Sequence, residues 1–146
     1  MYAAVILLGG VGINAISAEI NGKSFPVENV VYRDSAGALA GTARRTVDRT
    51  VYRDRQGRKI ATAKNAGGRT EYRDSTGKLV VTACQTGDRT VFRDSAGRMV
   101  GSARVSGNRT VYRDAQGRIV QCSQQMGKRT VFRDKKGKIS GTSQIR

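Results

Sequence analysis

The sequence predicts an all-β protein made of six consecutive β-hairpins. The aromatic residue of a short motif recurs every 20 residues, and a fixed period of this size is the signature of a repeat architecture. The six copies of this residue are Tyr32, Tyr52, Tyr72, Phe92, Tyr112 and Phe132. Each copy combines strand-forming residues with a following Asp-x-x-Gly, which is a turn signal. No segment of the repeats has the apolar spacing that an amphipathic helix requires.

Residues 1–18, MYAAVILLGGVGINAISA, are expected to be a cleaved signal peptide. An apolar run begins at Ala3, and the Ile-Ser-Ala of residues 16–18 resembles a small-residue cleavage site before Glu19. No Lys or Arg precedes the apolar run, so three other interpretations stay open: a start site placed too late, a lipid-facing anchor, or a buried first strand. Cleavage would place the mature protein outside the cytoplasm, as a secreted, periplasmic or cell-surface protein.

Residues 19–29 are predicted to form a short lead-in, and residues 30–146 the six-repeat β domain. The repeating unit can be written R-T-V-[YF]-R-D-x-x-G-[RK], followed by an apolar residue and a second strand. Its Asp-x-x-Gly suits a type I turn closed by a glycine with positive φ, the three-residue hairpin loop with a G1 bulge. A second reversal separates successive units. Four of these junctions contain glycine, and the first, Val47-Asp48, does not, so a looser turn is expected there.

The fourth repeat illustrates the expected register within a hairpin. If Asp94 faces Arg98 across the turn, strict alternation places Phe92 opposite Val100 and Thr90 opposite Ser102. The other face would then carry Val91, Arg93, Met99, Gly101 and Ala103. Both faces have an apolar middle, so a flat sheet would leave apolar area exposed. The sheet must therefore curl, pack on itself or pair with another chain.

Two arrangements fit a 20-residue unit. One is an antiparallel meander, which gives a curled repeat sheet of twelve strands, and the other is a parallel β-solenoid with one coil per repeat. A solenoid would stack the arginine before each turn Asp, from Arg33 to Arg133, at about 4.8 Å. Like charges directly across strands are destabilising. The meander, which doubles this spacing, is therefore the predicted fold.

The motif resembles the YD repeats of the Rhs and teneurin-type proteins. The segment Tyr112-Arg113-Asp114-Ala115-Gln116-Gly117-Arg118-Ile119 carries the likeness, and the other five copies match with small changes. The arginine before the Asp departs from that family, which commonly has a second tyrosine there. The resemblance implies repeated hairpins in a secreted or surface protein. It does not extend to encapsulation, because the chain is too short for a large shell and no toxin domain follows the repeats.

The charge of the chain predicts an anionic partner. Lys and Arg number 27 against 11 Asp and Glu, which gives a net charge of +16 and a pI of about 10.9. Residues 30–146 alone carry 26 basic and 9 acidic residues, a net charge of +17. A field of this sign attracts polyanions such as nucleic acid, glycans or lipopolysaccharide.

The basic residues recur in columns, so they form a regular array on a repeat fold. The predicted polyanion-binding residues follow the short turns, precede each turn Asp or follow each turn Gly. They are Arg49, Arg53, Arg58, Arg69, Arg73, Lys78, Arg89, Arg93, Arg98, Arg109, Arg113, Arg118, Arg129, Arg133 and Lys138. Binding by such an array would be salt-dependent and weakly sequence-specific. Some of these side chains are also expected simply to solvate the sheet.

The sequence disfavours an enzyme, and no cofactor, metal or catalytic residue is predicted. The chain contains no histidine, the commonest general base and metal ligand. Each Asp of the motif is expected to cap its own turn and to pair with the basic residue four positions later. The aromatic column is expected to pack in a core, with base stacking as the alternative.

Cys84 and Cys122 lie two repeats apart, at different positions of the unit. Four strand spacings in a meander separate them by about 19 Å, and a disulfide needs Cα atoms within about 7 Å. An internal bridge is therefore not expected unless the sheet closes on itself. Free thiols, which could also pair between chains in an oxidising compartment, are the alternative.

Three functions fit these observations. The first is a secreted, non-enzymatic repeat protein that binds an anionic surface polymer: a glycan, lipopolysaccharide or extracellular nucleic acid. The second is a structural scaffold that self-associates through its sheet edges, since an open sheet presents unpaired strands. The third is an intracellular, non-specific nucleic-acid binder, which requires that residues 1–18 are not a signal peptide.

Overall fold

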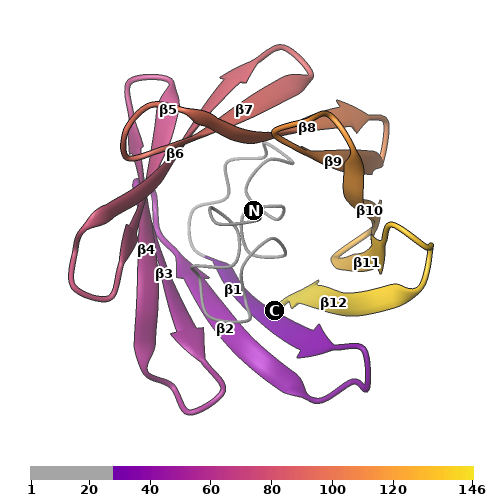
Figure 1. The fold of residues 1–146 in the computed structure, drawn as a ribbon. Coiled ribbons are helices and arrows are strands. Elements are labelled where there is room, and N and C mark those ends of the chain that lie inside the picture. The colour runs from indigo at the N-terminus through magenta and orange to yellow at the C-terminus, as the bar shows by residue number, and fades with distance from the viewer. Residues whose placement is uncertain (1–27) are drawn as a thin grey trace.

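The chain forms a closed antiparallel β-barrel of twelve strands. The computed structural model describes residues 28–146, and each strand pairs with its neighbour in the chain. The last strand pairs with the first, which closes the barrel (Figure 1). The strands are β1 (Glu28–Asp34), β2 (Leu39–Arg45), β3 (Arg49–Asp54), β4 (Lys59–Ala66), β5 (Arg69–Asp74), β6 (Leu79–Thr86), β7 (Arg89–Asp94), β8 (Met99–Ser106), β9 (Arg109–Asp114), β10 (Ile119–Met126), β11 (Arg129–Asp134) and β12 (Ile139–Ile145).

The predicted antiparallel meander is confirmed, and the parallel solenoid is wrong. Each repeat supplies one hairpin, and the sheet disposes of its apolar surface by curling until β1 meets β12. Val30 pairs with Ile145 and Asp34 with Gly141 along this seam. Closure leaves no free strand edge within residues 28–146, because every strand has two partners. The hypothesis of a scaffold that assembles through sheet edges assumed an open sheet, and the described strands form a closed one.

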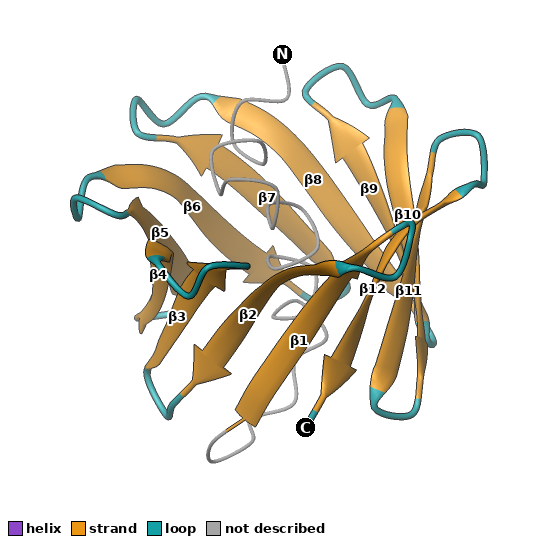
Figure 2. Cartoon of the chain, turned by 90° about the horizontal axis from the view of Figure 1, so that it is seen from below, coloured by secondary structure: helices purple, strands orange, loops and turns teal. Residues whose placement is uncertain are grey.

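The barrel has a rim of loops at each end of its strands (Figure 2), and the turns of the two rims differ. The Asp-turn rim carries the six loops that join the two strands of each repeat, from residues 34–38 to residues 134–138. The short-turn rim carries the five junctions between repeats, from residues 46–48 to residues 127–128. β1 begins and β12 ends at the short-turn rim. The first two residues of β1 fall within the predicted lead-in, and the predicted signal peptide of residues 1–18 lies outside the described residues.

The loops of the Asp-turn rim have the predicted geometry. In the fourth repeat the Gly97 amide donates to the Asp94 carbonyl at 3.0 Å, and the Asp94 amide donates to the Arg98 carbonyl at 2.9 Å. Gly97 has φ of 82°, which a residue with a Cβ adopts only at a cost. The Asp94 side chain accepts hydrogen bonds from the amides of Ala96 and Arg98, each at 2.9 Å. The Asp therefore caps its own turn, as expected.

The register expected beyond the turn is wrong by one residue. Arg93 pairs with Met99, but Phe92 pairs with Gly101, so Val100 is an extra residue that forms a β-bulge. The same shift occurs in all six hairpins. A bulge leaves one residue unpaired and increases the local twist of the strand. Strict alternation assumed an unbroken ladder and therefore placed the small residues of the second strand on the wrong face.

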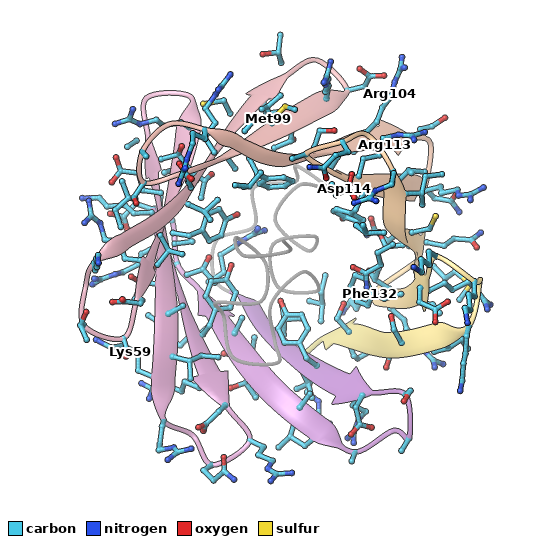
Figure 3. The ribbon with its side chains drawn as sticks, viewed as in Figure 1. Lys59, Met99, Arg104, Arg113, Asp114 and Phe132 are labelled. Carbon is cyan, nitrogen blue, oxygen red and sulfur yellow. The ribbon has the colours of Figure 1, made fainter. Side chains whose placement is uncertain are left out.

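The corrected register explains how the barrel buries its core. The aromatic column faces inward and is at most 4% exposed, and the Phe132 ring points into the barrel (Figure 3). Small residues of the second strands share this face, among them Ala63 opposite Tyr72 and Ala103 opposite Tyr112. The bulge residues Ile60, Val80, Val100 and Val120 pack against the same core. The expected packing role of the aromatic column is confirmed.

The junctions of the short-turn rim vary from repeat to repeat. Gly87, Gly107 and Gly127 each have positive φ at the first central position, as a type II′ turn requires. Gly67 and Gly68 both have positive φ, as in a type I′ turn. Val47-Asp48 has no positive φ, and β2 ends at Arg45, one residue before the corresponding point in β4. Thr46 nevertheless donates to the Arg49 carbonyl from its amide at 2.7 Å and from its hydroxyl at 3.0 Å, so the expected looser turn stays a prediction.

Candidate polyanion-binding surface

The outer face of the barrel carries the charge of the chain. Lys23 and Glu19 are the only charged residues of residues 1–27, so the net charge of +16 resides in residues 28–146. The predicted binding residues are all exposed except Arg73, which is half-buried. Basic side chains such as Lys59, Arg104 and Arg113 project away from the barrel axis (Figure 3). The structure therefore brings the predicted residues together on one continuous outer surface, in three belts.

The first belt lies beside the short-turn rim and consists of the first residue of five strands. Its members are Arg49, Arg69, Arg89, Arg109 and Arg129. The corrected register places further basic residues opposite this belt, namely Lys64 across from Arg49 and Arg104 across from Arg89. Sequence reasoning missed Lys64, Arg104 and the equivalent Arg44. Their exposure follows from the inward direction of their neighbours Ala63, Ala103 and Ala43, a signal available only once the bulge is known.

The second belt lies near the opposite end of the strands that begin with the first belt, beside the Asp-turn rim. It has a structural role that the sequence did not indicate. It consists of the arginine before each turn Asp, from Arg33 to Arg133. In every repeat the Nη1 of this arginine donates to the carbonyl oxygen of the turn Gly four residues later, at 2.8–3.1 Å. One donor of each guanidinium is thus committed to the turn, and a guanidinium has five.

The third belt belongs to the Asp-turn loops themselves. Its members are Arg58, Lys78, Arg98, Arg118 and Lys138. The three arginines each donate from Nε to the Asp four residues earlier, at 2.8 Å for Arg58, 2.9 Å for Arg98 and 2.7 Å for Arg118. These arginine side chains are 70–81% exposed, so the pairs contribute little to stability but do neutralise part of the charge of this rim.

Four of the six turn carboxylates have lowered pKa values, which favours their charged form. Desolvation alone would raise the pKa of Asp54 and of Asp114, but hydrogen bonds from the side chain and amide of Arg58 or Arg118 outweigh it and lower each pKa. In Asp94 the leading cause is the hydrogen bond from the Arg98 amide, which also lowers the pKa. In Asp74 the hydroxyl of Thr76 leads and acts in the same direction. The main role of these carboxylates is to stabilise their own turns.

Two further acidic residues partner basic residues near the first belt. Glu71 lies between Arg69 and Arg73 and accepts a hydrogen bond at 3.0 Å from each. The bond from Arg73 is the main cause of the lowered pKa of Glu71. Asp88 accepts from Arg104 Nε at 2.8 Å, which lowers its pKa in the same way.

The belts form a lattice of regular spacing. Equivalent residues two strands apart lie about 10 Å from each other around the barrel, because neighbouring strands are about 4.8 Å apart. Along one strand, the first and second belts are four residues apart, or about 13 Å. These spacings are comparable to the Debye length of about 8–10 Å at physiological ionic strength, so the fields of neighbouring guanidinium groups overlap. A flexible polyanion can engage several of them at once.

Within residues 28–146, the outer surface has few groups suited to base stacking or metal binding. The motif aromatics are buried, so their rings offer no outer platform for stacking bases. Within residues 28–146 there is no group of three or more potential metal ligands and no helix long and apolar enough to cross a membrane. Cys84 on β6 is exposed and Cys122 on β10 is half-buried, and both are free thiols. The Cys122 sulfur accepts a weak contact of 3.5 Å from Arg109 Nη2.

Comparisons with known proteins bear on the fold alone. No protein-family model matches the chain, and no curated protein matches it in sequence. Its structure is similar to the X-ray structure of a protein from Arabidopsis thaliana, with a TM-score of 0.56 and 15% sequence identity. The match covers 83% of this chain and 80% of the plant protein. The resemblance to YD repeats therefore stays a prediction.

Proposed function

We propose that the protein is a secreted, non-enzymatic binder of an anionic polymer, which it holds through the three basic belts on the outside of the barrel. The observation that carries the proposal is the division of charge. Most acidic side chains are engaged in turns or ion pairs, whereas the first belt is a regular row of five exposed arginines, of which Arg69 alone is in an ion pair among residues 28–146. A surface of this kind favours a regularly charged partner and needs no catalytic group.

An anionic glycan or lipopolysaccharide is the partner that the surface favours most. Arginine binds sulfate, phosphate and carboxylate groups through paired hydrogen bonds, which suits the acidic groups of such polymers. Nucleic acid is the second candidate, and it would bind through its phosphates, because the motif aromatics are turned inward. The intracellular version of this candidate also requires that residues 1–18 are retained.

A binding panel tests the proposal. The full chain is titrated with heparin, dextran sulfate, single-stranded DNA and uncharged dextran at low salt. We expect binding to the anionic polymers, release of each by added salt, and no binding to uncharged dextran. Equal affinity for charged and uncharged dextran, or no binding at all, would overturn the proposal.

Cell fractionation and intact mass test the location. Expression of the full chain in a bacterial host is expected to yield a protein that lacks residues 1–18, in the periplasm or medium. An uncleaved chain in the cytosol would contradict secretion and favour nucleic acid as the partner. The binding panel would then be repeated on the uncleaved protein with duplex and single-stranded DNA and RNA.

A further inference from the structure

The third repeat departs from the others at the short-turn rim. Glu71 occupies the outward position where the other five repeats have valine. Gly68 occupies the second position of its junction, where the other four junctions have residues with a polar or charged side chain. Its φ of 83° also differs, since only the first central residue of the three other glycine junctions has positive φ. The repeat pattern is therefore broken twice within four residues.

The backbone around Gly68 lacks a contact that the other junctions make. The second residue of each of those four junctions accepts a hydrogen bond at its carbonyl oxygen from an amide of the next hairpin, as Asp88 does from Val105 at 2.8 Å. Among residues 28–146, no such bond joins the Gly68 carbonyl to the Gln85 amide. With neither a side chain nor this bond, the β4–β5 turn leaves a gap beside β6.

This gap is a pocket of about 220 Å³ that reaches the inner wall of the barrel. Thr70 lines it and is half-buried, whereas its equivalents in the other repeats, Thr50, Thr90, Thr110 and Thr130, are buried. The volume is below the range of about 300–1,000 Å³ that is usual for drug-sized ligands. The pocket therefore suits a single small ring or its substituents.

The lining is unusually polar for the inner face. Asn65 and Gln85 occupy positions where Val105 and Ile145 pack against the core in other repeats. The Thr70 hydroxyl donates to Asn65 Oδ1 at 2.9 Å. The amides and hydroxyls of this group are the side chains that recognise neutral hydroxyl groups.

Thr90 supplies a hydroxyl with no partner. The residue is 2% exposed and lines the pocket, and its Oγ1 has no hydrogen bond among the described residues. A buried hydroxyl left unpaired costs free energy, so a polar group that enters the pocket and bonds to it recovers that cost. The orphaned hydroxyl is the observation that points to a ligand.

Arg69 completes the site. It lines the pocket, its side chain is 54% exposed, and its Nη2 donates to Glu71 at 3.0 Å. Glu71 thus holds the guanidinium on the outer face of β5, beside the pocket, from the position where other repeats have valine. The anchored guanidinium can still pair with an acidic group outside the pocket, because a guanidinium has five donors.

We propose that this pocket binds one sugar unit of an anionic polysaccharide through its hydroxyl groups, with Asn65, Gln85 and Thr90, while Arg69 on the outer face beside the pocket binds a sulfate or carboxylate of the same polymer. The proposal rests on the proposed function and narrows its ligand from polyanions in general to acidic glycans. A nucleobase fits less well, because Tyr72, the aromatic side chain of the lining, is only 1% exposed and presents no ring face for stacking.

A sulfated disaccharide prepared from heparin is the probe, with binding measured by calorimetry and by amide chemical shifts. We expect saturable binding and shifts centred on residues 65–70 and 85–90. Thr90→Val should weaken this binding about fivefold, the effect of one lost hydrogen bond, without lowering the melting temperature, because the hydroxyl has no partner in the fold. Asn65→Val, which introduces the residue found at position 105, should weaken binding at least as much.

Thr130→Val is the matched control, since Thr130 occupies the same position of another repeat and does not line the pocket. It should leave disaccharide affinity unchanged. If long heparin binds but the disaccharide does not, or if Thr90→Val and Thr130→Val have equal effects, the pocket proposal is wrong and the proposed function stands. If no polyanion binds, the proposed function itself fails.

Discussion

The loops of the two rims differ in how strictly their contacts repeat. At the Asp-turn rim all six loops repeat the same contacts: the Asp caps the turn, the glycine has positive φ, and the preceding arginine bonds to the glycine carbonyl. At the short-turn rim the five junctions use at least three backbone geometries. The sequence is therefore repeated most strictly where it builds the hairpin, and it varies where successive hairpins are joined.

This difference separates two kinds of basic residue that look alike in the sequence. The arginine before each turn Asp supports the fold through its bond to the turn glycine. Only its remaining donors are available to a ligand. The arginines of the first belt begin their strands and are not part of a repeated turn contact. Variation at the short-turn rim, as at Gly68, has also opened a pocket. The functional surface is therefore expected to centre on the short-turn rim.

The largest effect should come from neutralising arginines of the first belt. Arg89→Gln, Arg109→Gln and Arg129→Gln in one protein should weaken heparin binding strongly at low salt and reduce the salt slope by up to about three, since up to three ionic contacts are lost. The free energy of unfolding should stay unchanged. Titration calorimetry and urea denaturation measure the two quantities.

The matched variant neutralises the second belt in the same repeats, with Arg93→Gln, Arg113→Gln and Arg133→Gln. It should weaken binding and also destabilise the fold, by up to about 1 kcal/mol for each lost hydrogen bond to a turn carbonyl. Equal stability of the two triple variants would show that the rims do not differ as described.

Replacing a turn glycine should also destabilise the Asp-turn rim. Gly117 has φ of 81° with open space around its Cα, so Gly117→Ala introduces backbone strain without a clash. A residue with a Cβ costs about 1–2 kcal/mol in this conformation. Thermal unfolding measures the effect, and Gln116→Ala in the same turn serves as an exposed control with little expected change.

Acid should destabilise the fold through the turn carboxylates. The pKa values of Asp54, Asp74, Asp94 and Asp114 are lowered from the ordinary value of 3.8, so the unfolded chain binds protons more readily than the folded one. Their contribution to stability is complete above that value and is lost as the pH falls through the folded pKa values. Asp94→Asn should be less stable at neutral pH and should show a weaker dependence on acid. A parallel pH dependence for Asp94→Asn and the wild type would contradict this.

The smallest effect concerns the irregular first junction. Val47 is 84% exposed and the junction lacks glycine, so Val47→Asn with Asp48→Gly installs the sequence that favours a type I′ turn. The double variant should be more stable by less than about 1 kcal/mol in urea denaturation. A loss of stability would indicate that the contacts of this junction, such as the bond from the Asn65 amide to the Asp48 carbonyl, determine its shape.

Local chemistry made the hairpins predictable. The Asp-x-x-Gly loop, the role of the Asp and the inward packing of the aromatic column depend on residues within one repeat. The register beyond the turn was not predictable in the same way, because nothing in the side chain of Val100 marks it as the unpaired residue of a bulge. Closure depends on the pairing of Val30 with Ile145, which come from opposite ends of the described chain.

The candidate site likewise has residues that the repeat pattern predicts and residues that only the three-dimensional structure reveals. The fifteen predicted basic residues could be found because residues at the same position of successive repeats lie side by side around the barrel. Lys64 and Arg104 were missed because their side of the strand depends on the bulge. The pocket was missed because it arises from an absent side chain and an absent hydrogen bond at Gly68, and only the three-dimensional arrangement of Thr70, Gln85 and Thr90 reveals it.

The most direct test of the basic belts is the salt dependence of heparin affinity for the wild-type protein and the first-belt variant. We predict that the logarithm of the wild-type association constant falls linearly with the logarithm of salt concentration, with a slope that reports several ionic contacts. The variant should have a distinctly shallower slope. Identical slopes for the two proteins, or an affinity that does not change with salt, would contradict this prediction.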